Sequence, residues 1–517
     1  MKNNASVIVL LACLVTAVFI PMPLQAQDGN AYAAENRRAQ QERPRGNQRD
    51  GQGPRREPAE LKLPADVALL DRLSLVLGRP TAKSVTVSVL SAESAEAYVE
   101  YGSASGAGLR KTAMFKLPAG DPVEVLLDQL APDKSYVYRL FHRKPGEARY
   151  VEGEKYAFHT ARAPGSKFVF EIQGDSHPER SRQFSADFYA QTLRAAATDA
   201  PDFYMTIGDD FSVDTLPVVN AQTVTRRYQV QRPFLSLVAR AAPLFLVNGN
   251  HEQAAAYNLN GTPDNVAVWA QTARNRFFPQ PAPDGFYSGN NTPVPFIGLL
   301  RDYYAWTWGD ALFVVIDPYW HSMNPVDNVY GGGSKNRNLW AVTLGDAQYK
   351  WLKQTLESSK AKYKFVFAHH VLGIGRGGIE QAGLYEWGGK DPRGEDQFAQ
   401  RRPNWSLPIH QLMAKNGVTI FFQGHDHLFA RQQLDGVIYQ TLPSPANPFE
   451  DLRSFASAYR SGDVLTGAGR VRVSVAPEKV RVDLVRTPLP GDATKHSSNG
   501  EIAFSYEVGS KSPFDRQ

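Results

Sequence analysis

The chain has 517 residues, enough for two or three domains that each bury a core. Hydrophobic residues make up 42% and charged residues 21%, an ordinary globular composition that argues against a wholly disordered or fibrous protein. The net charge of +5 is spread along the chain rather than gathered in a block of one sign. We therefore expect no nucleic-acid partner.

The first residues have the pattern of a secretory signal peptide over residues 1–26. Lys2 precedes an apolar run from Ala5 to Ile20, and the small residue Ala26 ends the segment. The run is short for a bilayer span, which needs about 20 residues. We predict a secreted or periplasmic protein without a stable membrane span after cleavage. Lipoprotein anchoring at Cys13, the only cysteine, is the alternative.

Two compositional changes follow the signal. Residues 27–60 are rich in Arg, Gln, Gly and Pro and cannot bury enough surface to offset ordering, so we expect a disordered linker. Residues 61–165 consist of short β-rich runs between turn residues, typical of an antiparallel sandwich. Leu130, Pro132 and Tyr136 have the spacing of the corner motif of fibronectin type III domains. A small all-β, fibronectin III-like domain is predicted there.

Residues 166–490 have a mixed α/β pattern. Continuous apolar runs alternate with helix-like stretches, and such runs are typical of strands buried on both faces. The runs are "KFVFEIQ", "FYMTIG", "PLFLVNG", "ALFVVID", "KFVFAHH" and "VTIFFQG". Later runs at 436–443 and 469–487 are expected to complete the second sheet. Residues 491–517 are predicted to be a C-terminal tail.

Five of these runs end in residues that bind metal ions. Each ending alone is weak evidence for a metal site, because Asp and Asn are common in turns. Together they indicate a site, since functional groups gather at the carboxyl ends of strands in such sheets. The endings are Asp175-Ser176-His177, Asp209-Asp210, Asn250-His251-Glu252, His369-His370 and His425-Asp426-His427. Imidazole, carboxylate and amide donors suit Zn, Fe or Mn, and there are enough for two ions.

The order Asp-x-His, Gly-Asp, Gly-Asn-His-Glu, His and Gly-His-x-His resembles the signature of the calcineurin-like metallophosphoesterase superfamily, over residues 167–486. Residues 303–317 and 344–356 also resemble purple acid phosphatases, as does a fibronectin-like domain in front of the catalytic one. The resemblance implies a four-layer αββα sandwich. It also implies a dinuclear centre of two transition metal ions, Fe, Zn or Mn.

The resemblance carries over to individual residues. It implies that one metal is held by Asp175, His177, Asp209 and His427, and the other by Asp209, Asn250, His369 and His425. Asp209 would bridge the ions, and a hydroxide between them would be the nucleophile. His251 would act on the leaving group or on the transition-state charge. The family usually uses the first histidine of a pair, which favours His369 over His370.

One position departs from purple acid phosphatases. Those enzymes carry a tyrosine three residues after the bridging aspartate, where this chain has Ser212. They also lack the histidine of Asp-x-His. His177 is therefore expected to replace the tyrosinate, and the protein is not expected to be purple.

The segment between His370 and the last motif is long and rich in Gly, Arg and aromatic residues. Long insertions of this kind are often functional loops. We expect Arg376 and His370 to contact a substrate phosphate, with Tyr385 and Trp387 beside an organic leaving group. A solvated loop with packing aromatics is the alternative.

The sequence thus predicts an exported hydrolase, a dinuclear-metal phosphatase that cleaves phosphate monoesters of small substrates. A phosphodiesterase on the same metals is the alternative, because the superfamily includes both. A third reading is a non-catalytic surface protein that binds through the sandwich domain. The complete set of predicted ligands together with His251 favours an enzyme.

Overall fold

The computed structural model describes residues 61–105, 108–180, 183–324, 339–371, 376–448, 453–488 and 500–509. All of them belong to one compact unit, residues 46–517. The predicted signal peptide, the linker and Cys13 lie outside these residues. Within the described ranges, no helix is both long and apolar enough to cross a bilayer.

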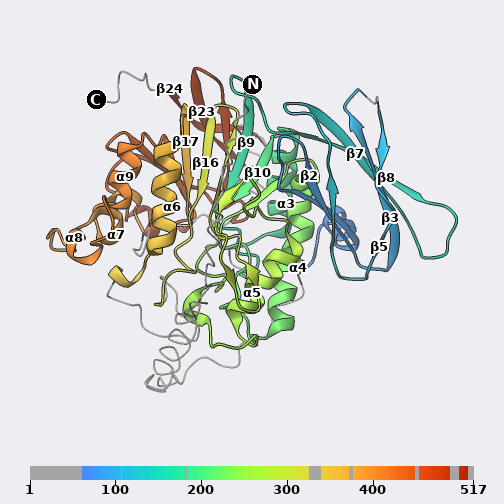
Figure 1. Cartoon of the computed structure of the whole chain (residues 1–517), viewed down its shortest axis with the longest axis horizontal. Helices are drawn as coiled ribbons and strands as arrows, with labels where there is room; N and C mark the ends of the chain where they lie inside the picture. Colours follow the sequence, from blue (N-terminus) through green and yellow to red (C-terminus); the bar gives the residue numbers. More distant parts are fainter. Residues whose placement is uncertain are drawn as a thin grey trace, which may run out of the picture. The chain divides into compact units, whose positions relative to one another are not determined.

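The N-terminal region forms two antiparallel sheets, as expected (Figure 1). One has the order β1-β2-β6; the other has β4-β3-β7-β8, with β5 beside β3. The strands are β1 (Leu73–Gly78), β2 (Val85–Ser91), β3 (Ala95–Ser103), β4 (Arg110–Lys111), β5 (Phe115–Leu117), β6 (Val123–Leu127), β7 (Ser135–Arg143) and β8 (Val151–His159). Alternate apolar residues such as Val87, Val99 and Leu140 form one core between the sheets. Helix α2 (Ala65–Arg72), absent from the sequence-based prediction, precedes β1.

A six-stranded sheet carries the first metal-binding motifs. Its order is β11-β10-β9-β22-β23-β24, with β9, β10 and β11 parallel. The strands are β9 (Phe168–Gln173), β10 (Phe203–Thr206), β11 (Leu244–Leu246), β22 (Gly469–Val475), β23 (Lys479–Arg486) and β24 (Ile502–Gly509). The edge strand β24 comes from the segment predicted as a C-terminal tail, and it pairs with β23 in antiparallel fashion.

An eight-stranded sheet carries the remaining motifs. Its order is β12-β15-β16-β17-β18-β20-β19-β21, and β16, β17, β18 and β20 run parallel. The strands are β12 (Ser288–Gly289), β15 (Tyr304–Trp308), β16 (Ala311–Val315), β17 (Tyr363–Phe367), β18 (Ile420–Gln423), β19 (Phe429–Leu434), β20 (Val437–Thr441) and β21 (Asp463–Leu465). A separate two-stranded ribbon pairs β13 (Pro293–Val294) with β14 (Gly298–Leu299).

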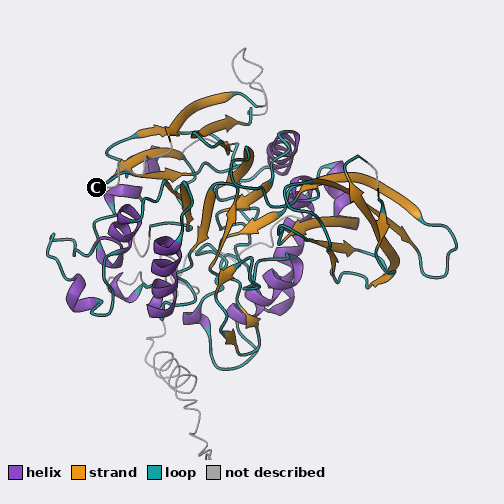
Figure 2. Ribbon diagram, turned by 45° about the horizontal axis from the view of Figure 1, so that its top comes forward, coloured by secondary structure: helices purple, strands orange, loops and turns teal. Residues whose placement is uncertain are grey.

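The two large sheets pack face to face between helices (Figures 1 and 2). Phe170, Phe313 and Phe422 belong to the core between the sheets. Helices α3 (Ala186–Thr198), α4 (Ala221–Ala239) and α5 (Val266–Phe277) share a core with β10 and β11, and α6 (Gly345–Ser358) and α9 (Ile409–Lys415) share one with β16 to β18. Shorter helices are α7 (Tyr385–Gly388), α8 (Phe398–Arg401) and α10 (Arg453–Ala456), with single turns at Ala256–Asn258, Leu339–Ala341 and Gly378–Glu380. This is the αββα sandwich expected from the sequence.

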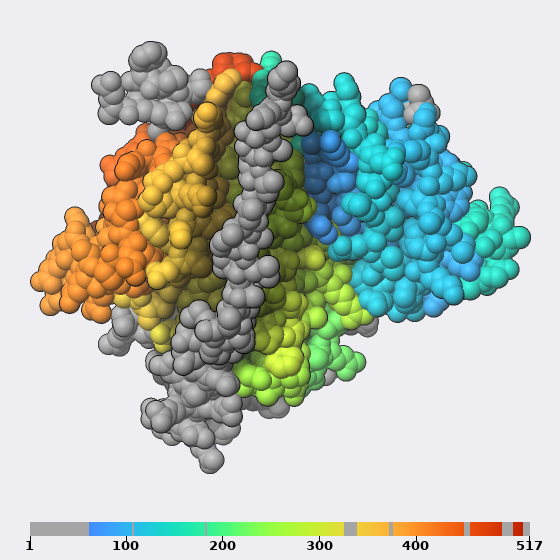
Figure 3. Space-filling model, in the orientation of Figure 1, coloured from blue at the N-terminus to red at the C-terminus, as the bar shows by residue number. Residues whose placement is uncertain are grey.

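Local sequence explains the flanking helices. The Ser185 side chain accepts a hydrogen bond from the Phe188 N–H at the start of α3, and Asn220 caps α4 in the same way. In α6, Tyr349, Leu352 and Leu356 recur at helical spacing and are buried. The opposite face of α6 is exposed, and Figure 3 shows this helix in yellow at the surface.

Candidate metal centre

The predicted metal ligands come together where parallel strands of both large sheets end. Asp175 follows β9, Asp209 follows β10 and Asn250 follows β11 in one sheet. His369 follows β17 and His425 follows β18 in the other. These residues, and also His177 and His427, are buried. The motifs are thus neighbours because the strands before them run in the same direction within a face-to-face pair of sheets.

Tight backbone turns present the ligands. Four of them have left-handed backbone angles: His177 (φ 46°), Asp209 (58°), His425 (69°) and His427 (57°). Such angles are unfavourable for residues with a Cβ atom. The glycines in the motifs avoid a further conflict, because a Cβ at Gly424 would meet Asp175 Oδ1.

One group of ligands surrounds Asp175. Its Oδ2 lies 3.1 Å from His427 Nε2 and 3.7 Å from His177 Nε2. The two imidazole Nε2 atoms are 3.1 Å apart. Three donor atoms therefore converge on one small volume, the arrangement that a single ion needs.

A second group lies on the other side of Asp209. Its Oδ2 is 3.1 Å from His369 Nε2 and 3.8 Å from His177 Nε2, so the carboxylate stands between the two groups. The rings of His369 and His425 are 5.3 Å apart between centroids. Asp209 Oδ2 is thus close to donor atoms of both groups.

The carboxylates and Asn250 are oriented for a cation. Asp175 Oδ1 accepts the backbone N–H of His425, and Asp209 Oδ1 accepts that of His251, both at 2.8 Å. Each Oδ2 therefore faces the cluster. Both polar atoms of the Asn250 side chain are buried without a hydrogen-bond partner in the described structure. Buried amides are rarely left so, and a metal ion would satisfy Asn250 Oδ1.

Neighbouring groups fix the imidazoles. His177 Nδ1 lies 2.9 Å from Glu179 Oε1 and 3.2 Å from Ser212 Oγ, and His369 Nδ1 lies 2.9 Å from the Ile207 carbonyl. Each contact turns Nε2 toward the cluster, as hydrogen bonds to metal-binding histidines commonly do. Ser212 holds the position of the tyrosine in purple acid phosphatases, and here its small side chain packs beside His177. The sequence prediction did not include Glu179.

The buried aspartates and histidines of the cluster shift one another's pKa values. Burial would raise the pKa of Asp175, but His369 and His427 hold it well below its usual range. Burial would lower the pKa of His177, but Glu179 and Asp175 raise it to about 9. Burial likewise opposes the charge of His369, and Asp209 and Asp175 raise its pKa to about 10. The negative cluster thus attracts protons strongly, as it would attract metal ions.

His251 lies at the rim of the cluster. Its Nε2 is 3.8 Å from Asp209 Oδ2 and 2.7 Å from Arg180 Nη2, and its Nδ1 is 2.8 Å from Asp214 Oδ2. Because a guanidinium only donates, Nε2 accepts from Arg180, and Nδ1 carries the proton donated to Asp214. Neither Asp214 nor Arg180 was predicted, since their contact with His251 depends on how three loops pack.

Glu252, the last residue of the Gly-Asn-His-Glu motif, joins two of the ligand loops. Its carboxylate accepts four backbone N–H groups, from Asp209, Asp210, Phe211 and Gly249, at 2.9 to 3.1 Å. The sequence motif includes Glu252, but its role is visible only in the structure. Its carboxylate binds the backbone of the ligand loops and does not face the donor atoms of the metal ligands.

Of the histidine pair, His369 faces both aspartates of the cluster. The ring of His370 stacks on His425 at 4.8 Å, and its Nδ1 lies 3.2 Å from the Tyr319 hydroxyl. This geometry favours His369 as the ligand. His370 remains beside the cluster, with its ligand atoms close to those of His369 and His425.

Arg376 contacts the Gly-His-Asp-His motif. Its Nη1 donates to Asp426 Oδ1 at 2.8 Å and to the His425 carbonyl, and its guanidinium lies over the Phe455 ring. The same Asp426 carboxylate accepts the Gly377 N–H and the Tyr459 hydroxyl. Arg376 therefore anchors its own loop to the metal-binding turn.

The two aromatic residues predicted beside the leaving group lie elsewhere. Trp387 is fully buried, packs on Phe421 and donates its indole N–H to the Tyr439 hydroxyl. Tyr385 is buried against Trp340 in the same core. The prediction that Trp387 contacts a substrate is wrong, because helix α7 packs this side chain into the core. Tyr385 is part of the same packing.

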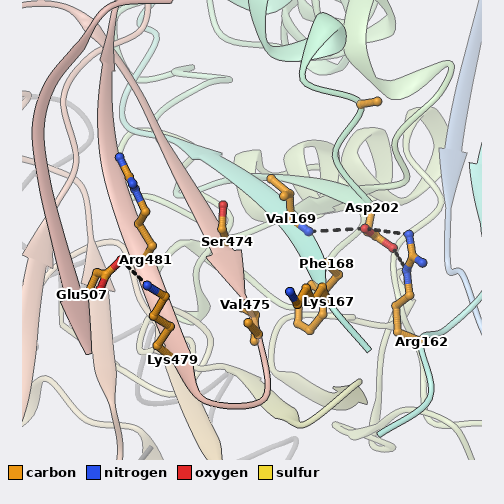
Figure 4. Close-up of a pocket in the computed structure, with 12 residues that line it drawn as sticks. Arg162, Lys167, Phe168, Val169, Asp202, Ser474, Val475, Lys479, Arg481 and Glu507 are labelled. Atoms are coloured by element: carbon orange, nitrogen blue, oxygen red, sulfur yellow. Dashed lines mark hydrogen bonds and ion pairs between the residues drawn. The ribbon is translucent and has the colours of Figure 1, made fainter. Parts of the chain in front are cut away.

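A hollow of about 540 Å³ opens at the opposite end of β9 from Asp175 (Figure 4). Its charged residues are largely paired: Arg162 with Asp202 at 2.6 Å and Lys479 with Glu507 at 2.8 Å. The hollow has no metal-binding cluster among its lining residues and is separate from the site.

Comparison with known families decides the identity of the domain. The family model of calcineurin-like phosphoesterases matches residues 170–429, about half of the chain and the whole of the candidate centre. The chain belongs to the calcineurin-like phosphoesterase family. This phosphoesterase is accordingly a metal-dependent phosphoric ester hydrolase, and its clustered His and Asp side chains are of the kind and spacing that could hold a metal ion.

Among the solved structures that match, that of PhoD shares the fold. The structure of PhoD matches 84% of this chain and 90% of its own, with 16% identity and a TM-score of 0.61. GAP50, the anchor in the inner membrane complex of Plasmodium, matches 68% of this chain and 90% of its own, with 12% identity and a TM-score of 0.36. An FN3 domain of human collagen XX matches 17% of this chain and 86% of its own, with 22% identity and a TM-score of 0.15. No curated protein matches the phosphoesterase.

Proposed function

We propose that this phosphoesterase is a dinuclear-metal phosphatase that hydrolyses phosphate monoesters of small substrates. The observation that carries the proposal is the position of Asp209 Oδ2, between His369 at 3.1 Å and His177 at 3.8 Å. One carboxylate oxygen shared by two groups of donors supports two ions rather than one. One ion would be held by Asp175, His177, Asp209 and His427, and the other by Asp209, Asn250, His369 and His425.

The chain's own residues supply the rest of the chemistry. When bound, two such ions would supply a water-derived nucleophile near neutral pH and would draw charge from the phosphoryl oxygens. His251 stands at the rim of the cluster with its ring fixed by Asp214, where it can donate to the leaving oxygen or to developing negative charge when Nε2 also carries a proton. Asp209 is held at two points: its carboxylate accepts the His251 N–H, and its own N–H donates to the Glu252 carboxylate.

The test compares p-nitrophenyl phosphate with bis-p-nitrophenyl phosphate across pH, on protein loaded with Zn, Mn or Fe. We expect faster hydrolysis of the monoester and close to two metal ions per chain. Faster hydrolysis of the diester would identify a phosphodiesterase on the same centre. A folded protein that takes up no metal would overturn the proposal.

We further propose that the protein is exported, with a signal peptide at 1–26, a linker at 27–60, a fibronectin III-like domain at 61–165 and the catalytic domain at 166–490. The hydrogen bond from the Ala131 N–H to the Tyr136 hydroxyl, at 2.7 Å, supports the fibronectin-like corner. N-terminal sequencing of the mature protein tests export. Gln27 as the first residue is the expected result, and a lipid-modified Cys13 would favour anchoring.

A further inference from the structure

Arg180 is a charged side chain at the entrance to the metal centre with no assigned task. It lies three residues after His177 in the loop that follows β9. Its side chain is 28% exposed, whereas those of Asp175 and Asp209 are 0% and 1% exposed. A molecule that approaches the cluster from solvent therefore meets this guanidinium before it meets the buried carboxylates.

Its own loop holds the guanidinium in place. Nε lies 3.3 Å from Glu179 Oε1, and Nη1 donates to Gln183 Oε1 at 3.2 Å. Glu179 is at the same time bound to His177 Nδ1, which links the arginine to a metal-binding imidazole. The planar group is thus oriented before any ligand binds, and less entropy is lost when it forms hydrogen bonds.

The remaining edge of the guanidinium faces His251. Nη2 donates to His251 Nε2 at 2.7 Å, and the ligand atoms of His251, His177 and Asp209 lie within 4.8 Å of one another. This bond joins a cation to a neutral acceptor. A phosphate oxygen is a stronger acceptor for the same N–H, because hydrogen bonds between two charged groups are about twice as strong as neutral ones.

We propose that Arg180 binds the phosphoryl group of the substrate through Nη2, exchanging His251 for a phosphate oxygen. The inference rests on the proposed phosphatase function and names a phosphate-binding residue for it. Arg376 is less suited to the task, because it is bound to Asp426 and covers Phe455. The exchange also releases His251 Nε2 toward the substrate.

The exchange at Nη2 leaves no buried carboxylate unpaired. Glu179 keeps its bond to His177, and Asp214 keeps its bond to His251. Arg227 of α4 also lies close enough to Glu179 and Asp214 to act on both charges. Arg180 Nη2 can therefore exchange its acceptor for a phosphate oxygen without leaving an uncompensated charge.

The experiment measures inorganic phosphate binding by calorimetry on the metal-loaded full chain, together with kcat and KM for p-nitrophenyl phosphate. The variants are Arg180→Gln and Arg180→Lys, with Arg194→Gln as the control. Arg194 is exposed on α3 and paired with Asp66. We expect Arg180→Gln to weaken phosphate binding about 10- to 100-fold and to raise KM similarly. Arg180→Lys should bind phosphate better than Arg180→Gln, because lysine keeps the positive charge but lacks the planar set of N–H donors.

Metal content should be the same in all four proteins. Phosphate binding that is unchanged in Arg180→Gln, or equally weakened in Arg194→Gln, would overturn the inference. So would wild-type protein that binds no phosphate, or loss of metal from both Arg180 variants. If the wild type binds phosphate through Arg180 but hydrolyses no ester, the proposed function fails and this inference stands.

Discussion

The carboxylate of Glu252 holds the backbone of Asp209: Glu252 Oε2 accepts the Asp209 N–H at 3.1 Å. The same oxygen accepts the Gly249 N–H, so one side chain joins the loops that follow β10 and β11. Asp209 and Asn250, proposed ligands of one ion, are therefore held at a fixed separation by a residue outside the ligand set.

Replacing Glu252 should loosen that separation. In Glu252→Gln the amide N–H₂ group would face backbone N–H groups that the carboxylate now accepts. We expect metal affinity to fall about 10- to 100-fold, as for other residues that orient metal ligands. Metal content after dialysis against graded chelator measures the change. Glu154→Gln, at an exposed position of β8, is the matched control and should bind metal as the wild type does.

Asp209→Asn should abolish phosphatase activity. Asparagine keeps the shape of the side chain but removes the charge that would bridge two ions. We expect hydrolysis of p-nitrophenyl phosphate to fall by at least about 10³-fold, the upper range for loss of one electrostatic group. Activity and metal content are measured together, and the exposed Asp264→Asn serves as control. Activity above one tenth of wild type with two bound ions would argue against a bridging role.

Metal-free protein should lose stability as pH rises. The raised pKa values of His177 (about 9) and His369 (about 10) mean that their ion pairs stabilise the fold fully below the usual histidine pKa of 6.5. That contribution is lost as pH rises through the folded-state values. The melting temperature of chelator-treated protein should therefore fall between pH 6.5 and 10.

Metal-loaded protein should lack this loss, because bound imidazoles are neutral and metal uptake displaces their protons. Thermal melts of both forms across the same buffers test the difference. Parallel pH profiles for the loaded and chelator-treated proteins would contradict the prediction. Below pH 6.5, burial of His427, which lowers its pKa to about 4, should reduce the stability of the metal-free form.

Arg232 should be important for joining the N-terminal sheet β1-β2-β6 to helix α4. It is buried, and it donates to Ser74 Oγ at 2.9 Å, to the Ser88 carbonyl at 2.8 Å and to the Phe277 carbonyl. Arg232→Met leaves these acceptors without a donor, so we expect a loss of about 3 to 5 kcal/mol in the free energy of unfolding. Denaturant titration measures it. Arg226→Met, exposed on the same helix, should change stability by less than about 0.5 kcal/mol.

The sequence was most informative where functional residues directly follow the end of a strand. Asp175, Asp209 and His425 could be placed because a buried apolar run stops immediately before each motif, and parallel strands bring such ends together. Asp214 could not be predicted as a partner of His251. The two residues are 37 positions apart, and their contact arises only from the packing of separate loops.

Aromatic residues in the long insertion misled the prediction for a related reason. Composition shows that the segment around Trp387 can fold, but not which way its side chains face. Burial of Trp387 against Phe421 decides that question through tertiary packing. Helix α2 was missed because eight residues give too weak a periodic pattern beside the strands that follow.

The left-handed backbone at His177, Asp209, His425 and His427 makes the centre dependent on the rest of the fold. Each such residue stores about 1 to 2 kcal/mol of unfavourable conformation that the surrounding structure must hold. A substitution far away that weakens either sheet therefore relaxes these turns first. Metal retention should respond to damage before secondary structure does, so the protein would release its ions, and with them its activity, while still largely folded.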